Sequence, residues 1–469
     1  MNAIINNERK RSFVIFMILL LFFLGMFAVY GLGVYNDSEQ YITMHIHREP
    51  LYPLFLLLCR KIAGESAGLV FSALIQNILT VLGIFYLVRY LQKNFSLTIW
   101  GELILLILEL LPHLVTKYVS ALGIFLENSI MSEALCIPLF QFFLLFTLRM
   151  LFEKKKSDAV CSLAFAFLLS MTRGQMMTTI LIWMIAAGVV LVMQKQYRKL
   201  AVPLLIVVCV FGARSLSVHV YNYFVTGYFM GNTYGKVNTL TNVIYACDKE
   251  DGEVFEEDSE ERAFFELFYE EADALTASYR YAGGTVTERA AHLEDYHDIL
   301  KFQVLEAHFS RYYFGLDTDY YTQSSLSDAM AGKMLRKLLP ECFGQWLYDY
   351  LLLCRNGFIR SIAIVHKWIN PAAYLLYFAA AALSVIVCRK NRKSRAVYVM
   401  GLALLFIIAN VCATSLTIMC LSRYMIYGFS LFYMALFLLI VEWRRNTAGH
   451  AKEAGGYLDK KKMRERDGD

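Results

Sequence analysis

Charged side chains are scarce in this chain of 469 residues. Asp, Glu, Lys and Arg together make up 18% of it, against about 25% in an average soluble domain. Apolar residues make up 58%, and the mean hydropathy is +0.46. This composition excludes a disordered chain, a collagen-like chain and an ordinary cytosolic enzyme.

Several signatures of well-known catalysts are also missing. The sequence contains no G-x-x-x-x-G-K-[ST] loop and no G-x-G-x-x-G turn, which cradle the phosphates of nucleotides. It also lacks the H-E-x-x-H, G-x-S-x-G and kinase signatures. The ten cysteines follow no zinc-site spacing, and seven of them lie within apolar stretches as small hydrophobic residues. We therefore expect no structural disulfide and no nucleotide-dependent chemistry.

Long apolar runs dominate the sequence. A helix needs about 20 apolar residues to cross a bilayer, and ten runs approach this length, the fifth being the shortest. The sequence therefore predicts an all-α polytopic membrane protein with about ten transmembrane helices. The runs are 12–33, 67–88, 95–112, 130–151, 159–172, 175–193, 200–217, 367–388, 396–418 and 425–442.

Basic clusters predict the orientation of these helices. Lys and Arg gather before the first run and after the second, fourth, sixth, eighth and tenth runs, so all clusters fall on one side if ten helices cross. Such clusters mark the cytoplasmic side. We therefore expect a multi-pass protein of the cell membrane with both termini in the cytoplasm.

Acidic residues are concentrated on the predicted outer side. Residues 218–354 hold 23 Asp and Glu against 10 Lys and Arg. We expect an N-terminal transmembrane module over 1–217 with a first outer loop at 34–66. A large, mainly helical extracytoplasmic domain over 218–366, called the acidic region below, would lie between the seventh and eighth helices. Transmembrane helices over 367–442 and a basic cytoplasmic tail over 443–469 would follow.

The first outer loop carries the best candidates for chemistry. Asp37 and Glu39 follow the first run directly, and two acids at this spacing can abstract a proton or bind a metal, or are ordinary solvated acids. Arg48 could bind a phosphate or lipid headgroups. His45 and His47 could ligate a metal, but a surface histidine pair is more often a bystander. Downstream, residues 51–59 have an apolar helical face that suits the membrane interface.

Further ionisable residues are expected near the outer ends of the helices. Glu133 lies about one turn inside the fourth run, where a carboxylate must face protein or a water-filled cavity. Several cations are expected at the same level, and they could either snorkel or bind an anionic lipid phosphate. Together, an acid could activate a hydroxyl acceptor while cations hold a lipid-linked phosphate leaving group. These cations are Arg173, Arg214, Lys367 and Arg423.

In their order and on their common side, these motifs resemble the GT-C superfamily of membrane glycosyltransferases. The resemblance is to the bacterial relatives of dolichyl-phosphate-mannose protein mannosyltransferases, and it covers about residues 1–215 and 365–442. The acidic region fits only by position, as the large outer loop of such enzymes. The motifs are Asp37, Glu39 and Tyr41, then Arg48-Glu49-Pro50-Leu51-Tyr52-Pro53, Ser132-Glu133, Arg173 and Arg423-Tyr424.

The resemblance implies inverting transfer of a hexose from a polyprenyl-phosphate-linked donor to an extracytoplasmic glycan, lipid or protein, with no nucleic acid involved. Asp37 would be the general base, and Glu39 would support it. Many relatives carry adjacent acids or Asp-x-Asp here, whereas this chain has Asp37-Ser38-Glu39. Whether the activity needs a divalent cation, Mg²⁺ or Mn²⁺, is therefore left open; if it does, these two acids would be the ligands. The donor phosphate would be bound by Arg48, Arg173, Arg423, Tyr424 and Lys367, in a pocket shaped by Tyr41, Tyr52 and Glu133.

Other functions also fit a membrane protein of this kind. A polysaccharide ligase or polymerase uses lipid-linked donors as well. A transporter or flippase of lipid-linked sugars would show repeated halves and broken helices near the bilayer midplane, whereas here the ionisable residues crowd the outer ends. A non-enzymatic scaffold would use the acidic region only to bind a partner.

Overall fold

The structure is a computed structural model that describes residues 2–119 and 123–466. Within these ranges the chain is helical, without strands, and its one isolated β-bridge joins Gly33 to Ser129. Residues 120–122 of the expected outer segment 113–129 lie outside the described residues. So do the side chains after residue 447, which include most of the predicted basic tail.

Nine helices of the described chain are long and apolar enough to cross a membrane. This confirms an all-α, multi-pass membrane protein, with one such helix fewer than the ten expected. The helices are α1 (Asn2–Tyr30), α4 (Glu65–Asn94), α5 (Ile99–Tyr118), α6 (Ser132–Glu153), α8 (Thr178–Met193), α9 (Ala201–Thr226), α16 (Asn370–Lys390), α17 (Arg395–Ser415) and α19 (Tyr427–Arg466). Helix α8 alone has 16 residues, and the turn η2 (Gly174–Met177) directly before it extends this span to 20 residues.

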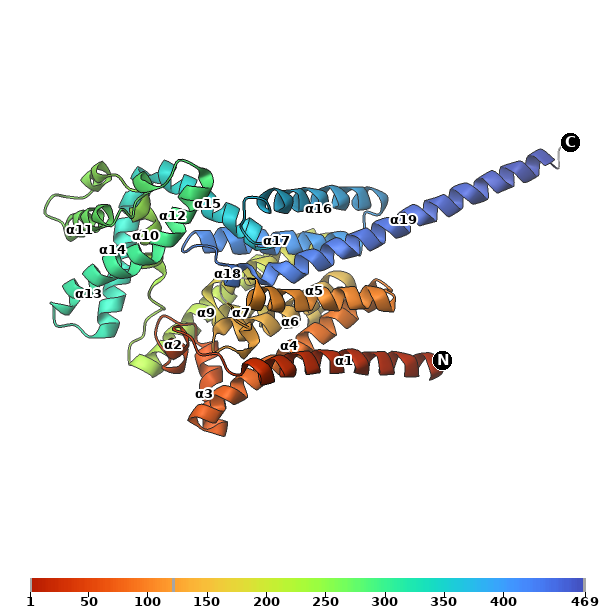
Figure 1. Ribbon diagram of the computed structural model, residues 1–469, viewed down its shortest axis with the longest axis horizontal. Coiled ribbons are helices and arrows are strands. Elements are labelled where there is room, and N and C mark those ends of the chain that lie inside the picture. The colour runs from red at the N-terminus through yellow and green to blue at the C-terminus, as the bar shows by residue number, and fades with distance from the viewer. Residues whose placement is uncertain (1, 120–122, 467–469) are drawn as a thin grey trace.

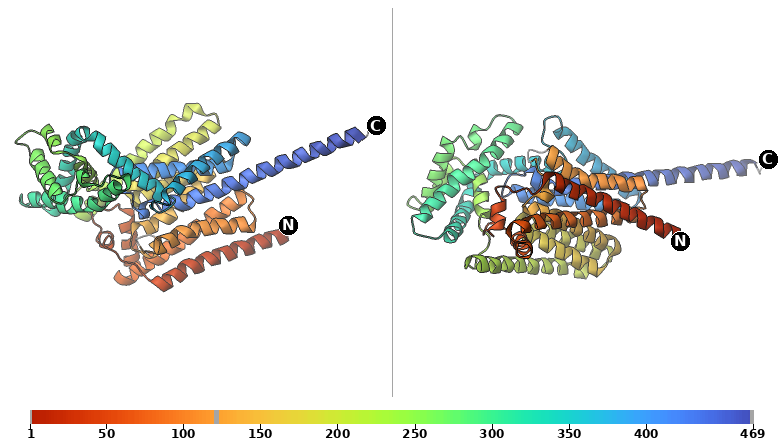
Figure 2. Two further views of the ribbon diagram at one scale, coloured as in Figure 1. Left: turned by 45° about the horizontal axis from the view of Figure 1, so that its top comes forward. Right: turned by 60° about the horizontal axis from the view of Figure 1, so that its bottom comes forward.

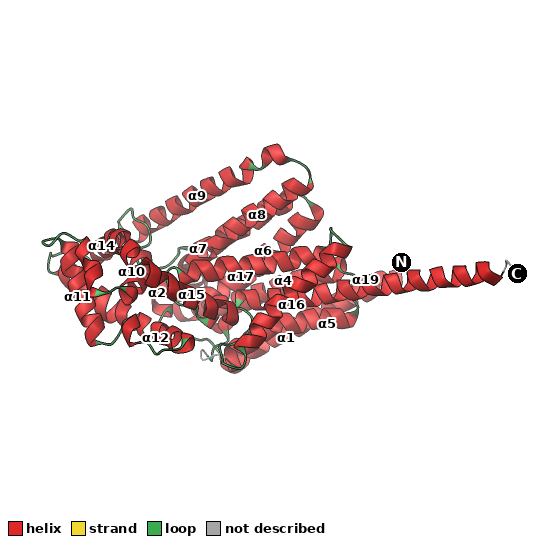
Figure 3. Ribbon diagram, turned by 90° about the horizontal axis from the view of Figure 1, so that it is seen from above, coloured by secondary structure: helices red, strands yellow, loops and turns green. Residues whose placement is uncertain are grey.

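The difference in number comes from the expected run 159–172. It forms α7 (Lys156–Thr172), which has only 17 residues. A short link joins α6 to α7, and Arg173 at the far end of α7 pairs with Glu133 in the first turn of α6. Helix α7 therefore returns to the level at which α6 begins, although it is the shorter helix. It lies between α6 and α8 in the view of Figure 3.

The two ends of the chain lie at the same end of the helix bundle (Figures 1 and 2). The nine long helices and α7 together make ten passes along the bundle, and this even number brings the two ends to the same side. The acidic region lies at the opposite end of the bundle, called the distal end below.

A short helix at the distal end has an exposed apolar face. This helix, α3 (Leu51–Ala63), buries Tyr52, Leu56 and Cys59 against the bundle. On its other face Leu58 is 58% exposed and Ile62 is 65% exposed. An apolar face of this kind on a helix too short to span suits the membrane interface.

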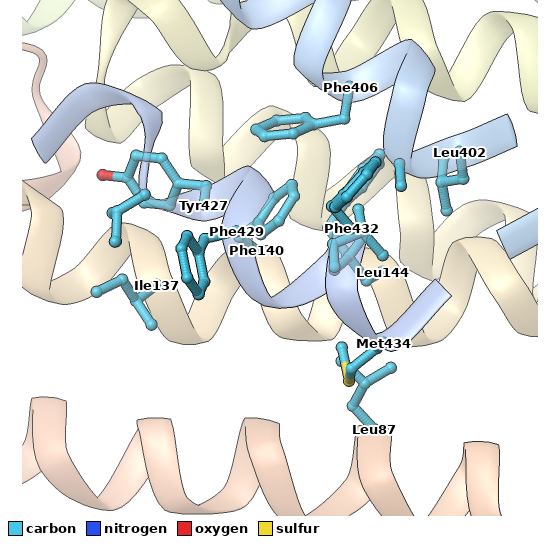
Figure 4. Packing of buried hydrophobic residues seen from close by; sticks show 14 of the residues in the cluster. Leu87, Ile137, Phe140, Leu144, Leu402, Phe406, Tyr427, Phe429, Phe432 and Met434 are labelled. Atoms are coloured by element: carbon cyan, nitrogen blue, oxygen red, sulfur yellow. The ribbon is translucent and has the colours of Figure 1, made fainter. Parts of the chain in front are cut away.

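Aromatic side chains fill the centre of the bundle where α6, α17 and α19 meet (Figure 4). The ring centroids of Phe140 and Phe406 are 4.4 Å apart, and Tyr427 packs against Phe140 at 6.0 Å. Close approach also depends on Gly83 of α4, since a Cβ atom there would lie only 3.0 Å from Cβ of Gln141. Small residues and dense packing hold membrane helices together, because lipid offers them little hydrophobic drive to associate.

The acidic region has an apolar core of its own. Phe264, Phe268 and Phe309 are buried there with Leu240 and Tyr245. Side-chain oxygens cap its helices; Ser259, Thr285 and Asp319 accept hydrogen bonds from first-turn amides. Its elements are α10 (Gly235–Ala246), η4 (Lys249–Val254), α11 (Glu260–Ala274), η5 (Tyr279–Tyr281), α12 (Val286–Ile299), the π-helical turn η6 (Leu300–Glu306), α13 (Ala307–Phe314), α14 (Tyr320–Glu341) and α15 (Phe343–Arg360).

Candidate active site

The loop after α1 is fixed against the start of α6. The amide of Gly33 donates to the carbonyl of Asn128, and the amide of Ile130 donates back to the carbonyl of Gly33, both at 2.9 Å. One turn later, the Ser38 hydroxyl donates to the carbonyl of Ile130 at 2.8 Å. Ser38 begins the one-turn helix α2 (Ser38–Ile42), and Asp37 precedes it directly. These bonds hold the Asp37 carboxylate beside the distal end of α6.

Two arginines from opposite ends of the chain flank Asp37. Arg48 Nη2 lies 2.8 Å from Asp37 Oδ1, and Arg423 Nη1 lies 3.2 Å from Oδ2. Arg423 belongs to α18 (Ser422–Met425), the short turn before α19. Burial would raise the pKa of the Asp37 carboxyl, but the charges of Arg48 and Arg423 outweigh it and hold that pKa below its usual value. Asp37 is therefore ionised in this state.

A second carboxylate lies behind the first pair. Glu133 is 1% exposed, and its Oε2 lies 2.5 Å from Arg173 Nη1, while its Oε1 lies 3.8 Å from Arg423 Nε. Arg173 Nη1 also donates to the Ser132 hydroxyl at 3.0 Å. Arg423 thus links the Asp37 pair to the Glu133 pair.

Tyrosines complete this network. Tyr41 OH lies 2.9 Å from the Ser132 hydroxyl and accepts a hydrogen bond from Arg48 at 3.2 Å. The guanidinium carbons of Arg173 and Arg423 each lie 5.0 Å from the ring centroid of Tyr424. Such cation–π contacts help to satisfy guanidinium groups that have little access to water. The distal network, as we call it, consists of Asp37, Tyr41, Arg48, Ser132, Glu133, Arg173, Arg423 and Tyr424.

Two cavities flank the distal network. Cavity A has a volume of about 710 Å³. The arginines Arg48, Arg173 and Arg214 contribute to its polar wall, and Met177, Leu181 and Phe211 contribute to its apolar wall. Its apolar wall comes from α8 and α9, and α9 lies at the edge of the bundle (Figure 3).

Cavity B, of about 740 Å³, lies between the membrane part and the acidic region. Asp37 and Arg423 line one side of it, and Tyr234, Asp298 and Lys301 line the other. The two cavities share part of their walls, so they adjoin at the network. The shared residues are Arg48, Tyr234, Asn238, Ile418 and Tyr424.

The structure places the remaining predicted site residues outside the network. Glu39 is exposed, and within the described chain it makes no ion pair and lines neither cavity. Lys367 is exposed beside Trp368 and is absent from both cavity walls. Tyr52 is fully buried beneath Tyr41, with ring centroids 5.0 Å apart, and its hydroxyl donates to Gln76. Tyr52 therefore supports Tyr41 from behind.

Four further residues contribute to the site. Arg214 lines cavity A and is paired with Glu49, and Tyr234 and Lys301 come from the acidic region. The sequence pointed to Arg214 as one of the outer cations and to Glu49 as part of the motif that begins at Arg48, but it assigned neither to the site. Tyr234 and Lys301 were missed. The sequence around Tyr234 and Lys301 carries no comparable signal.

The histidine pair at 45 and 47 is held within the protein. His47 Nδ1 lies 2.9 Å from the Thr233 hydroxyl, and its ring stacks on Tyr234 with centroids 4.2 Å apart. Burial, together with the smaller effect of the charge of His45, lowers the pKa of His47 to about 3. His47 therefore acts as a neutral packing residue between the loop and the acidic region.

The acids of the first loop do not form a metal site. Both oxygens of Asp37 face arginines, and Glu39 is exposed. In the two described ranges, no group of three or more His, Cys, Asp or Glu side chains is arranged to hold a metal ion. Because both Asp37 oxygens are engaged by arginines while Glu39 is exposed, the two acids are not arranged as a joint pair of ligands for Mg²⁺ or Mn²⁺.

No protein-family model, curated protein or solved structure matches this chain.

Proposed function

We propose that the protein is a membrane glycosyltransferase that transfers a sugar from a polyprenyl-phosphate carrier to an acceptor hydroxyl at the distal end of the bundle. One observation carries this proposal: the ionised carboxylate of Asp37 lines a cavity and lies in a network of three arginines, where an apolar-walled cavity adjoins a polar one. The distal end would face outward, and both termini would be cytoplasmic, as the basic clusters indicate.

Cavity A suits the lipid-linked donor. Arg48 and Arg173 would bind the carrier phosphate, because guanidinium groups match phosphate oxygens in geometry and charge. The first isoprene units would lie against Met177, Leu181 and Phe211, which form the apolar wall. A polyprenyl phosphate needs both features at once, and cavity A offers both.

Cavity B would hold the acceptor. Its hydroxyl oxygen attacks the anomeric carbon, and the bond from that carbon to the phosphate oxygen breaks. The electron pair of the broken bond goes to the phosphate, and the hydroxyl proton goes to Asp37. The arginines stabilise the charge that develops on the departing phosphate. Attack from the side opposite the phosphate inverts the anomeric configuration.

The two arginines beside Asp37 would tune its basicity. With Arg48 and Arg423 in place, the pKa of Asp37 is low and the carboxylate is a weak base. An incoming phosphate competes with Asp37 for Arg48, since Arg48 lines both cavities. Loss of part of this pairing would raise the proton affinity of Asp37 when donor is bound.

Sugar transfer in proteoliposomes tests the proposal. Purified protein receives a panel of polyprenyl-phosphate hexoses and a membrane extract as the acceptor pool, and released polyprenyl phosphate is measured. Asp37 is about one-third exposed, so Asp37→Asn should fold normally while transfer falls about 10²–10⁴-fold, the usual contribution of a general base. The matched control is Asp258→Asn, which removes an exposed carboxylate of the acidic region.

Two outcomes would contradict the proposal. Carrier movement across the bilayer without release of the sugar would support a flippase instead. Full transfer by a correctly folded Asp37→Asn protein would remove Asp37 from the role of base.

A further inference from the structure

Lys301 is an unusual residue on the wall of cavity B. It is 3% exposed, yet its ammonium has no carboxylate within 4.0 Å in the described chain. The ammonium lies instead against aromatic faces: Nζ is 3.4 Å from the ring centroid of Tyr234 and 4.3 Å from that of Phe302. A buried ammonium without an anionic partner is costly.

The other charged residues on this wall are already paired. Arg48 and Arg423 both contact Asp37, and Asp298 Oδ1 lies 3.2 Å from Nδ1 of His297. Among the described residues that line cavity B, Lys301 is therefore the cation without an ion pair within 4.0 Å; the carboxylates of Glu306 and Asp298 act on it only from a greater distance.

The backbone holds Lys301 in place with irregular geometry on both sides. It lies in the π-helical turn η6, and such turns are frequent at functional sites. Tyr234, beneath its ammonium, has a φ of +102°, which is strained for a residue with a bulky side chain. The amide of Tyr234 donates to Asp328 at 3.1 Å, and His47 stacks on its ring. The fold thus fixes this ammonium at the cavity wall.

We propose that cavity B takes an anionic acceptor, a hydroxyl compound that carries a phosphate or a carboxylate, and that Lys301 binds this anionic group. Lys301 lies on the acidic-region wall and Asp37 on the membrane-part wall, so a bound acceptor would reach both. The anion would give the ammonium the direct ion pair that it lacks, and the acceptor hydroxyl would face Asp37. Identification of the ligand as the acceptor rests on the proposed sugar transfer, whereas anion binding at Lys301 does not.

Binding to the full-length protein in nanodiscs, without any donor, tests this proposal. The probes are two matched pairs, glycerol 1-phosphate with glycerol and glucuronate with glucose, and the readout is the melting temperature at increasing probe concentration. We expect at least one anion to raise the melting temperature saturably at concentrations where its neutral partner has no effect.

Variants of Lys301 make the test specific. Lys301→Met and Lys301→Gln should weaken the apparent anion affinity at least about tenfold, since a charged hydrogen bond is lost. Lys301→Arg should keep it within a few-fold, and Lys333→Met, which removes an exposed lysine of α14, should not change it. Either neutral variant suffices if the other fails to fold.

Three results would overturn the proposal: no saturable effect of either anion on the wild type, equal binding by the neutral partners, or unchanged binding by a folded neutral variant. A Lys301-dependent shift seen only with polyprenyl phosphate would also overturn it, because Lys301 would then bind the donor. If the wild-type protein binds the anion through Lys301 but transfers no sugar, the proposed function is contradicted and anion binding at Lys301 still stands.

Discussion

The buried pair of Glu133 and Arg173 offers a quantitative test of the distal network. Glu133 Oε2 lies 2.5 Å from Arg173 Nη1, and the two side chains are 1% and 13% exposed. Removal of one partner from a buried pair costs roughly 3–5 kcal/mol, because the other charge is left without compensation. The cost of Glu133→Gln should lie near the lower end of this range. The amide oxygen of the glutamine can still accept a hydrogen bond from Arg173, and Arg173 keeps its hydrogen bond to the Ser132 hydroxyl.

A double-mutant cycle separates this pair from general damage. Arg173→Gln alone leaves the Glu133 carboxylate with Arg423 at 3.8 Å as its remaining partner, and it should be costly as well. The double variant Glu133→Gln/Arg173→Gln leaves no uncompensated charge. Its destabilisation should therefore be smaller than the sum of the single effects by about 1–3 kcal/mol.

The assay is unfolding in mixed SDS micelles, followed by far-ultraviolet circular dichroism, with Glu39→Gln as the surface control. Because Glu39 is exposed, this control should change the free energy of unfolding by less than about 0.5 kcal/mol. Additive effects of the two single variants, or a Glu133→Gln cost as small as that of the control, would refute the packed network.

Three further predictions address the loop, the buried lysine and the orientation. Glu39→Gln should keep at least half of the wild-type transfer rate, because Glu39 lines neither cavity; a loss as large as that of Asp37→Asn would place Glu39 in the chemistry. Burial lowers the pKa of Lys301 to about 8 although Glu306 opposes the shift, so its protonated form disfavours folding below pH 8. Lys301→Met should therefore unfold at a higher temperature than the wild type at pH 7. This difference should shrink between pH 8, where the folded wild type loses the proton, and pH 10.5, where the unfolded wild type loses it. A constant difference across this window would contradict the reasoning. Finally, Asp258→Cys in intact cells should react with an impermeant maleimide, and reaction only after permeabilisation would reverse the proposed orientation.

The titration of Lys301 also depends on charges from both sides of cavity B. Glu306 and Asp298 face it from the acidic region, and Asp37 and Arg48 face it from the first loop. The anions raise its pKa, and Arg48 lowers it, but burial has the largest effect. Neutralisation of one of these charged groups should therefore shift the pKa of Lys301 less than exposure of its side chain to water would.

Apolar run length was a reliable guide to the fold. Nine of the ten expected helices are long and apolar enough to span, and the tenth, run 159–172, is the shortest of the ten apolar runs in the sequence. Sequence could not give the rotation of each helix about its axis. The place of Lys367 beside an apolar run predicted its level along the bundle, but not the direction of its side chain. The side chain is exposed and lines neither cavity.

The candidate site was only partly predictable for a related reason. Charges near the ends of apolar runs are rare enough to attract notice, so Asp37, Glu133, Arg173 and Arg423 could be chosen from sequence. In the acidic region charge is common, and Lys301 is one of ten basic residues over 218–354. What distinguishes Lys301 is its burial against Tyr234, across 67 positions of sequence, and no local pattern encodes that contact.

The most direct test of the account is a structure of the protein with polyprenyl phosphate bound. The account predicts the phosphate in cavity A, within hydrogen-bonding distance of Arg48 and Arg173, with the isoprene chain along Leu181 and Phe211. The contact between Arg48 and Asp37 should be longer than the 2.8 Å of the free protein. A phosphate bound away from these arginines, or a chain lying on a face of the bundle remote from Asp37, would contradict it.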